Sequence, residues 1–102
     1  MIVLFRMVVS MLRMVLRLNE TATIKDKRRV ILGIKDKLHH RYRLSCAEVD
    51  LQDSLSFAEL GAALVSNSPE FGEKVLRDAV VFVEDHYPVE LYEVQTHYEV
   101  YG

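Results

Sequence analysis

The feature that most constrains the fold is the hydrophobic period, which changes along the chain. From Met7 to Leu18, apolar side chains return at every second position, and Arg13 and Arg17 lie among the alternate positions. A period of two is typical of a β-strand with one buried face. The face predicted to be buried carries Val8, Leu12, Met14, Leu16 and Leu18.

The same N-terminal residues also have features of a targeting segment. Residues 1–18 are largely apolar, and their arginines and serine fall at helical spacing. The arginines, however, interrupt the apolar run long before the ~20 residues that a membrane helix requires. No small-residue cleavage site follows them. We therefore expect a strand that starts at Met7, an N-terminal extension over residues 1–6, and no membrane partner.

A helix is predicted from Ile24 to about Arg41. Thr23 followed by Asp26 forms a capping-box pattern, in which a hydroxyl and a carboxylate satisfy backbone amides at the helix start. Apolar residues then recur at helical spacing, with charged residues on the opposite side of the helix. The apolar stripe consists of Ile24, Ile31, Ile34, Leu38 and Tyr42.

The second half of the chain predicts three more strands and one more helix. Residues 44–51 and 57–66 have the pattern of an antiparallel hairpin joined by a polar segment. Ser68 and Pro69 mark the start of a helix that Pro88 ends, as a cap and a first-turn proline. Alternation over residues 91–101 predicts a last strand with one hydrated face, and places Tyr92 and Tyr98 toward the helices.

This order of elements, βαββαβ, indicates an α+β, ferredoxin-like domain. Right-handed crossovers place both helices on one face of a four-stranded antiparallel sheet. The 102 residues, half of them apolar, suffice for one hydrophobic core but not for two. We expect a single domain over residues 7–102. The single cysteine, Cys46, cannot form an internal disulfide and has no paired histidine, which favours a buried role and a cytoplasmic location.

Charge is distributed unevenly between the two halves of the sequence. Residues 1–43 contain eleven Lys and Arg but three acidic residues, a net charge of +8. Residues 44–102 contain two Lys and Arg against twelve acidic residues, a net charge of −10. Halves of opposite sign either pair within the fold or leave a dipolar surface that attracts a charged partner.

The first predicted helix holds the candidate binding site. Lys25, Lys27, Arg28 and Arg29 occupy its first turns, where the positive end of the helix macrodipole disfavours cations by about 0.3 kcal/mol or more each. Local helix stability does not explain them, whereas phosphate binding does. The alternative is that they pair with the acidic half of the domain. The candidate nucleic-acid-binding residues are Lys25, Lys27, Arg28, Arg29, Lys35, Lys37, Arg41 and Arg43.

No catalytic, cofactor-binding or metal-binding site is predicted. Glu48, Asp50 and Asp53 have no histidine or cysteine at ligand spacing beside them, and pairing with basic residues is the simpler role. Adjacent His39 and His40 would point about 100° apart on a helix, unlike a chelating i,i+4 pair. We therefore expect no cofactor and no enzymatic activity.

A second candidate surface is the sheet face that points away from the helices. This face is expected to carry charges of both signs together with four apolar side chains. An open apolar patch, or an unpaired edge strand, is suited to pairing with a second copy of the chain. The candidate dimer face consists of Val9, Met11, Phe57 and Val65.

Several segments, taken together, carry a resemblance to a known family. They are the opening strand Met7–Leu18, Thr-Ile-Lys-Asp-Lys-Arg-Arg at 23–29, Ser-Cys-Ala-Glu-Val-Asp at 45–50 with Asp53, Ala58, Leu60-Gly61 and Val65-Ser66-Asn67. They resemble the YlxP-like bacterial family (domain of unknown function 503) over about residues 7–100. The resemblance implies a ferredoxin-like fold with no assigned activity. It also implies gene neighbours that encode translation initiation and ribosome maturation factors. The chain departs from the family in residues 19–22, where a proline is usual.

Functions from different classes remain open at this point. The first is a non-enzymatic factor that binds ribosomal or other structured RNA through the basic helix. The second is a homodimeric protein-interaction module without nucleic-acid binding, and the third is an enzyme that uses the carboxylates. The net charge of −2 counts against RNA binding, because dedicated RNA binders are usually basic. Only the local basic patch favours it.

Overall fold

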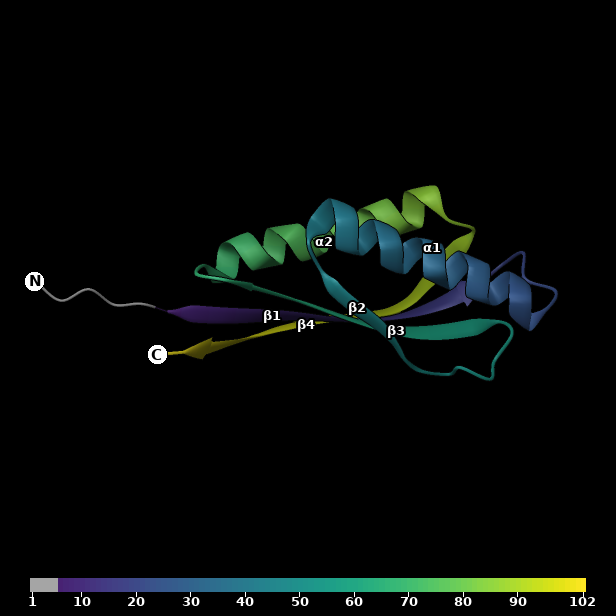
Figure 1. Ribbon diagram of the computed structural model, residues 1–102, viewed down its shortest axis with the longest axis horizontal. Helices are drawn as coiled ribbons and strands as arrows, with labels where there is room; N and C mark the ends of the chain where they lie inside the picture. The colour runs from purple at the N-terminus through teal and green to yellow at the C-terminus, as the bar shows by residue number, and fades with distance from the viewer. Residues whose placement is uncertain (1–5) are drawn as a thin grey trace, which may run out of the picture.

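The computed structural model describes residues 6–102, and the elements follow the predicted βαββαβ order (Figure 1). They are β1 (Met7–Leu18), α1 (Ile24–Tyr42), β2 (Ser45–Asp50), β3 (Phe57–Ser66), α2 (Pro69–His86) and β4 (Val89–Tyr101). The predicted N-terminal extension lies outside the described residues, apart from Arg6, which is exposed and precedes β1.

The four strands form one antiparallel sheet in the order β2-β3-β1-β4. Both helices lie on the same face of this sheet, and its other face is open (Figure 1). This arrangement confirms the ferredoxin-like fold. Strands β2 and β4 are the two edges, and they differ in length, because β2 has 6 residues and β4 has 13.

The core lies between the helices and the central strands. Every second residue of β1 and of β3 is buried, as the period of two predicts. Helix α1 buries one stripe against this face, and α2 buries another. Each large apolar side chain removed from water in this way contributes about 1.5–3 kcal/mol. Side chains at the centre of this core are Met14, Leu16, Ile34, Leu38, Leu60, Leu76 and Val83.

Gly72 sets how closely α2 approaches β1. A Cβ atom added at Gly72 would lie 2.8 Å from Ser10 Cβ, and closer still to Ser10 Oγ. Only glycine therefore permits this helix position. Ser10 is buried below Gly72, and its hydroxyl finds no hydrogen-bond partner among the described residues.

Strand β4 contains a bulge that corrects one prediction. Leu91 lies opposite Leu16 and Glu93 lies opposite Val15, so Tyr92 is an extra residue in the ladder. The Tyr92 ring makes an edge contact with Phe57, at a centroid distance of 5.1 Å, on the open face of the sheet. The prediction that Tyr92 faces the helices was wrong, because simple alternation takes no account of a bulge.

Candidate nucleic-acid interface on helix α1

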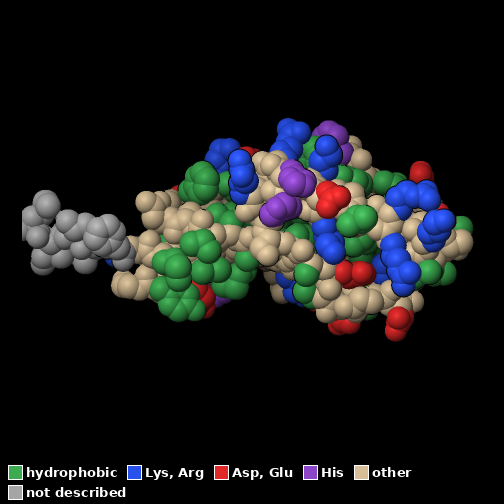
Figure 2. All heavy atoms as spheres, in the orientation of Figure 1, with side chains coloured by type: hydrophobic (Ala, Val, Ile, Leu, Met, Phe, Trp, Pro, Cys, Tyr) green, Lys and Arg blue, Asp and Glu red, His purple; other side chains and the backbone are tan. Residues whose placement is uncertain are grey.

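The basic residues of α1 lie on its solvent side. Lys25, Arg28, Arg29, Lys37 and Arg41 are exposed, as is Arg43 at the C-terminal end of the helix, and Lys35 is half-buried. Figure 2 shows Lys and Arg side chains spread along the part of the surface that α1 forms. We call these seven residues, Lys25, Arg28, Arg29, Lys35, Lys37, Arg41 and Arg43, the α1 basic surface.

The α1 basic surface has no ion-pair partner within the described chain. The ion pairs of residues 6–102 with N to O distances up to 4.0 Å involve Arg13, Lys27, Lys74, Arg77 and His97, and none of the seven surface cations. Apart from the buried pair of Lys27 with Glu48, the opposite charges of the two halves therefore do not neutralise each other by direct pairing on α1. The geometry leaves these cations available to an external anion.

The helix N-terminus itself is already occupied by a carboxylate of the chain. Asp26 Oδ2 accepts hydrogen bonds from the Ala22 and Thr23 amides, both at 3.2 Å, and Thr23 Oγ1 accepts one from the Asp26 amide at 3.1 Å. This confirms the predicted capping box. An external phosphate would therefore meet the side chains of the α1 basic surface rather than the amides of the first turn.

Arg41 joins the α1 basic surface to helix α2. Its guanidinium carbon lies 4.7 Å from the centre of the Phe82 ring and 5.7 Å from that of Tyr42. Stacking on an aromatic ring orients a guanidinium without using its N–H donors, because the attraction comes from the face of the ring. Arg41 thus remains able to donate hydrogen bonds to a ligand.

Lys27 does not belong to the interface, although its charge placed it among the sequence candidates. Its side chain is 1% exposed. Its Nζ donates to the carbonyl oxygens of Leu51 and Ser54, both at 2.6 Å, and lies 3.4 Å from that of Gln52. All of its donors are directed into the β2–β3 loop, so no external phosphate can reach them.

Lys27 instead fixes the β2–β3 loop against α1. Leu51 adopts a left-handed backbone conformation (φ 63°) that a side chain disfavours by about 1–2 kcal/mol, and the hydrogen bond from Lys27 holds its carbonyl in place. Glu48 Oε2 lies 3.1 Å from Nζ and neutralises the buried charge, although it is not aligned as a hydrogen-bond acceptor. The stem of Lys27 covers the core, because Lys27 lies four residues before the buried Ile31 on the same side of α1.

The other polar candidates have structural roles. Asp50 Oδ1 accepts a hydrogen bond from the Leu51 amide at 2.7 Å, while Asp53 is exposed. Burial raises the pKa of the Cys46 thiol to about 11, so the thiol stays protonated near neutral pH. Within residues 6–102, no group of three or more His, Cys, Asp or Glu side chains is placed to hold a metal ion.

The candidate dimer face is divided into two parts by charge. Val9 and Val65 are direct neighbours across β1 and β3, and Met11 follows on the same face. Phe57 lies at the other end of β3, about 27 Å from Val65 at ~3.4 Å per residue.

Arg13 lies between these two parts. It forms ion pairs with Glu59 at 2.9 Å and Glu93 at 3.1 Å, and these contacts, first that with Glu59, raise the pKa of its guanidinium. The four apolar residues therefore do not form one continuous patch.

Comparison with known proteins agrees with the architecture. Residues 9–96 match a family described as "Protein of unknown function (DUF503)". The chain belongs to the DUF503 family. The matched range of this DUF503 protein runs from β1 into β4 and includes all of the α1 basic surface. No curated protein is similar enough in sequence to count as a relative. None of the helices in the described part of the chain is long and apolar enough to cross a membrane.

Sequence reasoning missed one surface of this DUF503 protein, the groove between α2 and β4. Its lining residues come from two elements that are separate in the sequence. The apolar alternation of β4 was the sequence pattern that could have indicated this groove. Val94, Tyr98 and Val100 were assigned to a buried face, yet they are 41%, 51% and 41% exposed. They point toward the helix side, but α2 does not cover them.

Proposed function

We propose that this DUF503 protein is a non-enzymatic factor that binds the phosphate backbone of structured RNA, free or within the ribosome, through the α1 basic surface. The observation that carries the proposal is the presence of seven accessible or half-accessible cations along one helix and its C-cap, with no carboxylate of residues 6–102 paired to them. Unpaired cations in such number create a positive local potential that attracts an anionic partner.

The extent of the surface favours a polymer over a small anion. Helix α1 has 19 residues, which is about 28 Å at 1.5 Å per residue, and cations occur along its whole length. A single phosphate could contact two or three of them. A nucleic-acid backbone presents phosphates at intervals along its length and could contact most of them.

The arginines suit phosphate recognition better than lysines would. Four of the seven residues are Arg28, Arg29, Arg41 and Arg43, whose planar guanidinium groups donate two parallel hydrogen bonds to phosphate oxygens. The family resemblance, with its gene neighbours in translation, favours RNA among the polyanions. The open sheet face carries the Arg13, Glu59 and Glu93 cluster, and its Phe57 and Tyr92 rings contact each other edge to face, so the proposal assigns RNA binding to α1 and not to this face.

A charge-reversal experiment tests the proposal. Arg28→Glu/Arg29→Glu should weaken binding to a structured ribosomal RNA fragment. The logarithm of its association constant should also fall less steeply with the logarithm of the salt concentration, by the amount expected for the loss of about two phosphate contacts. The matched control is Lys74→Glu/Arg77→Glu on α2, which changes the net charge equally but should leave the slope unchanged. Both pairs are exposed, so both variants should remain folded, and Lys74→Glu/Arg77→Glu should melt a few degrees lower because it replaces two i,i+4 ion pairs by like-charge pairs.

The opposite result would exclude the interface. If Arg28→Glu/Arg29→Glu lowers the melting temperature and leaves RNA binding as it was, the two arginines stabilise the domain and do not bind RNA. If both double variants lose affinity equally, net charge governs binding and α1 has no special role.

A further inference from the structure

Strand β4 has a long unpaired edge. It pairs with β1 on one side, and no strand of the described chain pairs with its other side. Protein edges are usually protected from pairing by shortness, by charged side chains, by proline or by bulges. Strand β4 has 13 residues, no lysine and no proline, and its bulge at Tyr92 leaves residues 93–101 in regular register with β1. Its outer backbone groups therefore form a template to which a further strand can hydrogen-bond.

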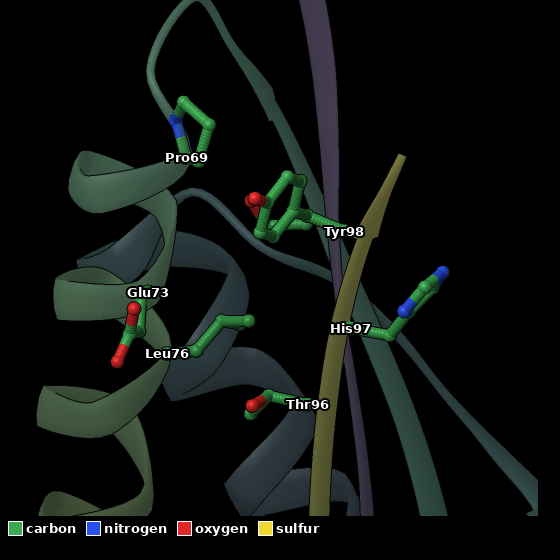
Figure 3. Close-up of a pocket in the computed structure, with 7 residues that line it drawn as sticks. Pro69, Glu73, Leu76, Thr96, His97 and Tyr98 are labelled. Carbon is green, nitrogen blue, oxygen red and sulfur yellow. The ribbon is translucent and has the colours of Figure 1, made fainter. Parts of the chain in front are cut away.

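A groove runs beside this edge, between α2 and β4. Two adjoining hollows of about 270 and 210 Å³ line up along it. In Figure 3, Thr96 and Tyr98 point from β4 toward Pro69, Glu73 and Leu76 of α2, while His97 points to the opposite side of the strand. A strand added to the edge of β4 would place every second side chain in this groove, which is how strand addition gains specificity.

The groove is bordered by apolar side chains that the folded monomer leaves in water. Val81 on α2 is 51% exposed, and Val94, Tyr98 and Val100 on β4 are 41–51% exposed. Figure 2 shows hydrophobic side chains gathered at the end of the molecule where β1 begins and β4 finishes. An apolar surface next to an unpaired strand edge indicates a protein interface.

We propose that the occupant of this edge is a second copy of the chain, whose β4 pairs antiparallel with β4 around a two-fold axis at Tyr98. The product is a continuous eight-stranded sheet with all four helices on one face, because the axis is perpendicular to the sheet. This is an isologous interface, in which the same patch contributes from both subunits. It is independent of the α1 basic surface.

The side chains of β4 are self-complementary in this register. On the open face, His97 meets Glu99 of the partner subunit, and the symmetry repeats this pair. His97 Nε2 already lies 2.7 Å from Glu99 Oε1 within one chain, so the dimer surrounds the axis with alternating imidazole and carboxylate groups. On the groove side, Thr96 meets Val100 of the partner subunit and Tyr98 meets its own copy, which are favourable cross-strand pairs.

A shift of the axis to Thr96 removes this match. Glu93 would then lie opposite Glu99 of the partner subunit, twice, and like charges directly across a ladder are destabilising. The charge pattern thus selects a register as well as a partner. A foreign strand would need to reproduce the same alternation of acid, imidazole and apolar residues.

The position of α2 leaves room for this arrangement. Helix α2 lies mainly over β1, so two helices related by the axis would be separated by about three strand spacings, roughly 14 Å. Packed helices approach to 8–10 Å, and the remaining trough would be filled by the side chains of Val81, Val94 and Tyr98 from both subunits.

Two variants test the edge, and a third serves as the matched control. Tyr98→Lys and Val94→Lys place a charge on the groove side of β4, and Val65→Lys places one on the open face at a position that is 65% exposed. Sedimentation equilibrium at about 100 μM should give a dimer for the wild type and for Val65→Lys. The two β4 variants should dissociate at least about 30-fold more readily, as expected for central interface residues.

A charge exchange tests the register. His97→Glu should weaken the dimer by placing acid opposite acid, and the double variant His97→Glu/Glu99→His should restore it, since each acid again faces an imidazole. Amide hydrogen exchange tests the backbone pairing directly. The amides of residues 94–100 that point away from β1 should exchange slowly only at concentrations where the dimer forms. Circular dichroism confirms that each variant is folded.

Three results would overturn the proposal. A wild-type monomer at 100 μM excludes the interface. If Val65→Lys dissociates the dimer while Tyr98→Lys and Val94→Lys leave it intact, the two subunits contact each other through the open face. A dimer that all of the variants retain, without protection of the β4 amides, places the contact elsewhere.

Discussion

At the scale of single residues, burial decides the role of a charge more than its position in the sequence does. Lys27 and Arg28 are adjacent on the same basic helix, and sequence reasoning placed both in one interface. The structure buries Lys27 against the β2–β3 loop and leaves Arg28 in solvent. The helical period places Lys27 four residues before Ile31, on the side of the apolar stripe. It could not reveal the carbonyl oxygens of Leu51 and Ser54, which come from a loop more than 20 residues away.

Replacement of Lys27 by methionine should destabilise the domain. The change keeps most of the apolar stem but leaves the Glu48 carboxylate without its cation and the loop carbonyls without their donor. We expect a loss of about 2 kcal/mol in unfolding free energy, or about 10 °C in melting temperature. Lys25→Met, at an exposed position on the same helix, should change stability by less than about 0.5 kcal/mol. Equal melting temperatures for the two variants would contradict the role assigned to Lys27.

The Cys46 thiol should be slow to react at neutral pH. Burial raises its pKa to about 11, so the reactive thiolate is scarce until strongly alkaline pH. Alkylation followed by mass spectrometry should give a rate that rises toward pH 11 in the folded protein and toward pH 9 in denaturant. Because folding favours the neutral thiol, the stability from this site is complete below about pH 9 and is lost as the pH rises toward 11. Rapid alkylation of the folded protein at pH 7 would contradict this assignment.

At the scale of elements, local patterns predicted most of the fold, and contacts between elements account for what they missed. Strand β3 and the start of each helix lie at the predicted residues, because alternation and capping patterns depend only on residues that are close together in the sequence. The predicted last strand began at residue 91, whereas β4 begins at Val89. The bulge at Tyr92 was missed because it depends on the register with β1, which no local pattern contains.

Two glycines in the helices should respond in opposite ways to alanine. At Gly33 an added Cβ would lie 3.4 Å from Tyr87 Cε1, an ordinary contact, so the better helix propensity of alanine should add up to about 1 kcal/mol. At Gly72 the added Cβ would overlap Ser10, and overpacking should cost about 1–3 kcal/mol despite that propensity. Urea unfolding of the two variants checks both signs. Ser10→Gly should recover part of the loss in Gly72→Ala, and no recovery would show that another contact is responsible.

At the scale of the whole molecule, the formal net charge of −2 conceals a separated charge distribution. Sequence counts revealed the asymmetry between the two halves but left open whether they neutralise each other. The fold answers this for the α1 basic surface, since its seven cations make no ion pairs with the acidic half, whereas the buried Lys27 pairs with Glu48. The acidic residues are distributed over the open sheet face, α2 and the loops, among them Glu59, Glu84, Asp85 and Glu93.

This separation predicts binding to a polyanion that the overall charge would repel. Charges in solution are screened over about 10 Å at 0.1 M salt, whereas the α1 basic surface extends along a helix of about 28 Å. A polyanion on α1 therefore responds mainly to the local cations. We expect the wild-type protein, with a pI near 6.1, to be retained on a heparin column at pH 7.5 and low salt.

Two variants of equal net charge separate the local field from the total charge. Arg28→Glu/Arg29→Glu and Lys74→Glu/Arg77→Glu each change the net charge by −4, from −2 to −6. The first pair should strongly reduce retention on heparin, because it lowers the charge of the seven-residue α1 basic surface from +7 to +3. The second should elute close to the wild type, since Lys74 and Arg77 already pair with Asp78 and Glu73 on α2. Identical elution of the two variants would mean that total charge, and not the placement of cations on α1, controls the interaction with polyanions.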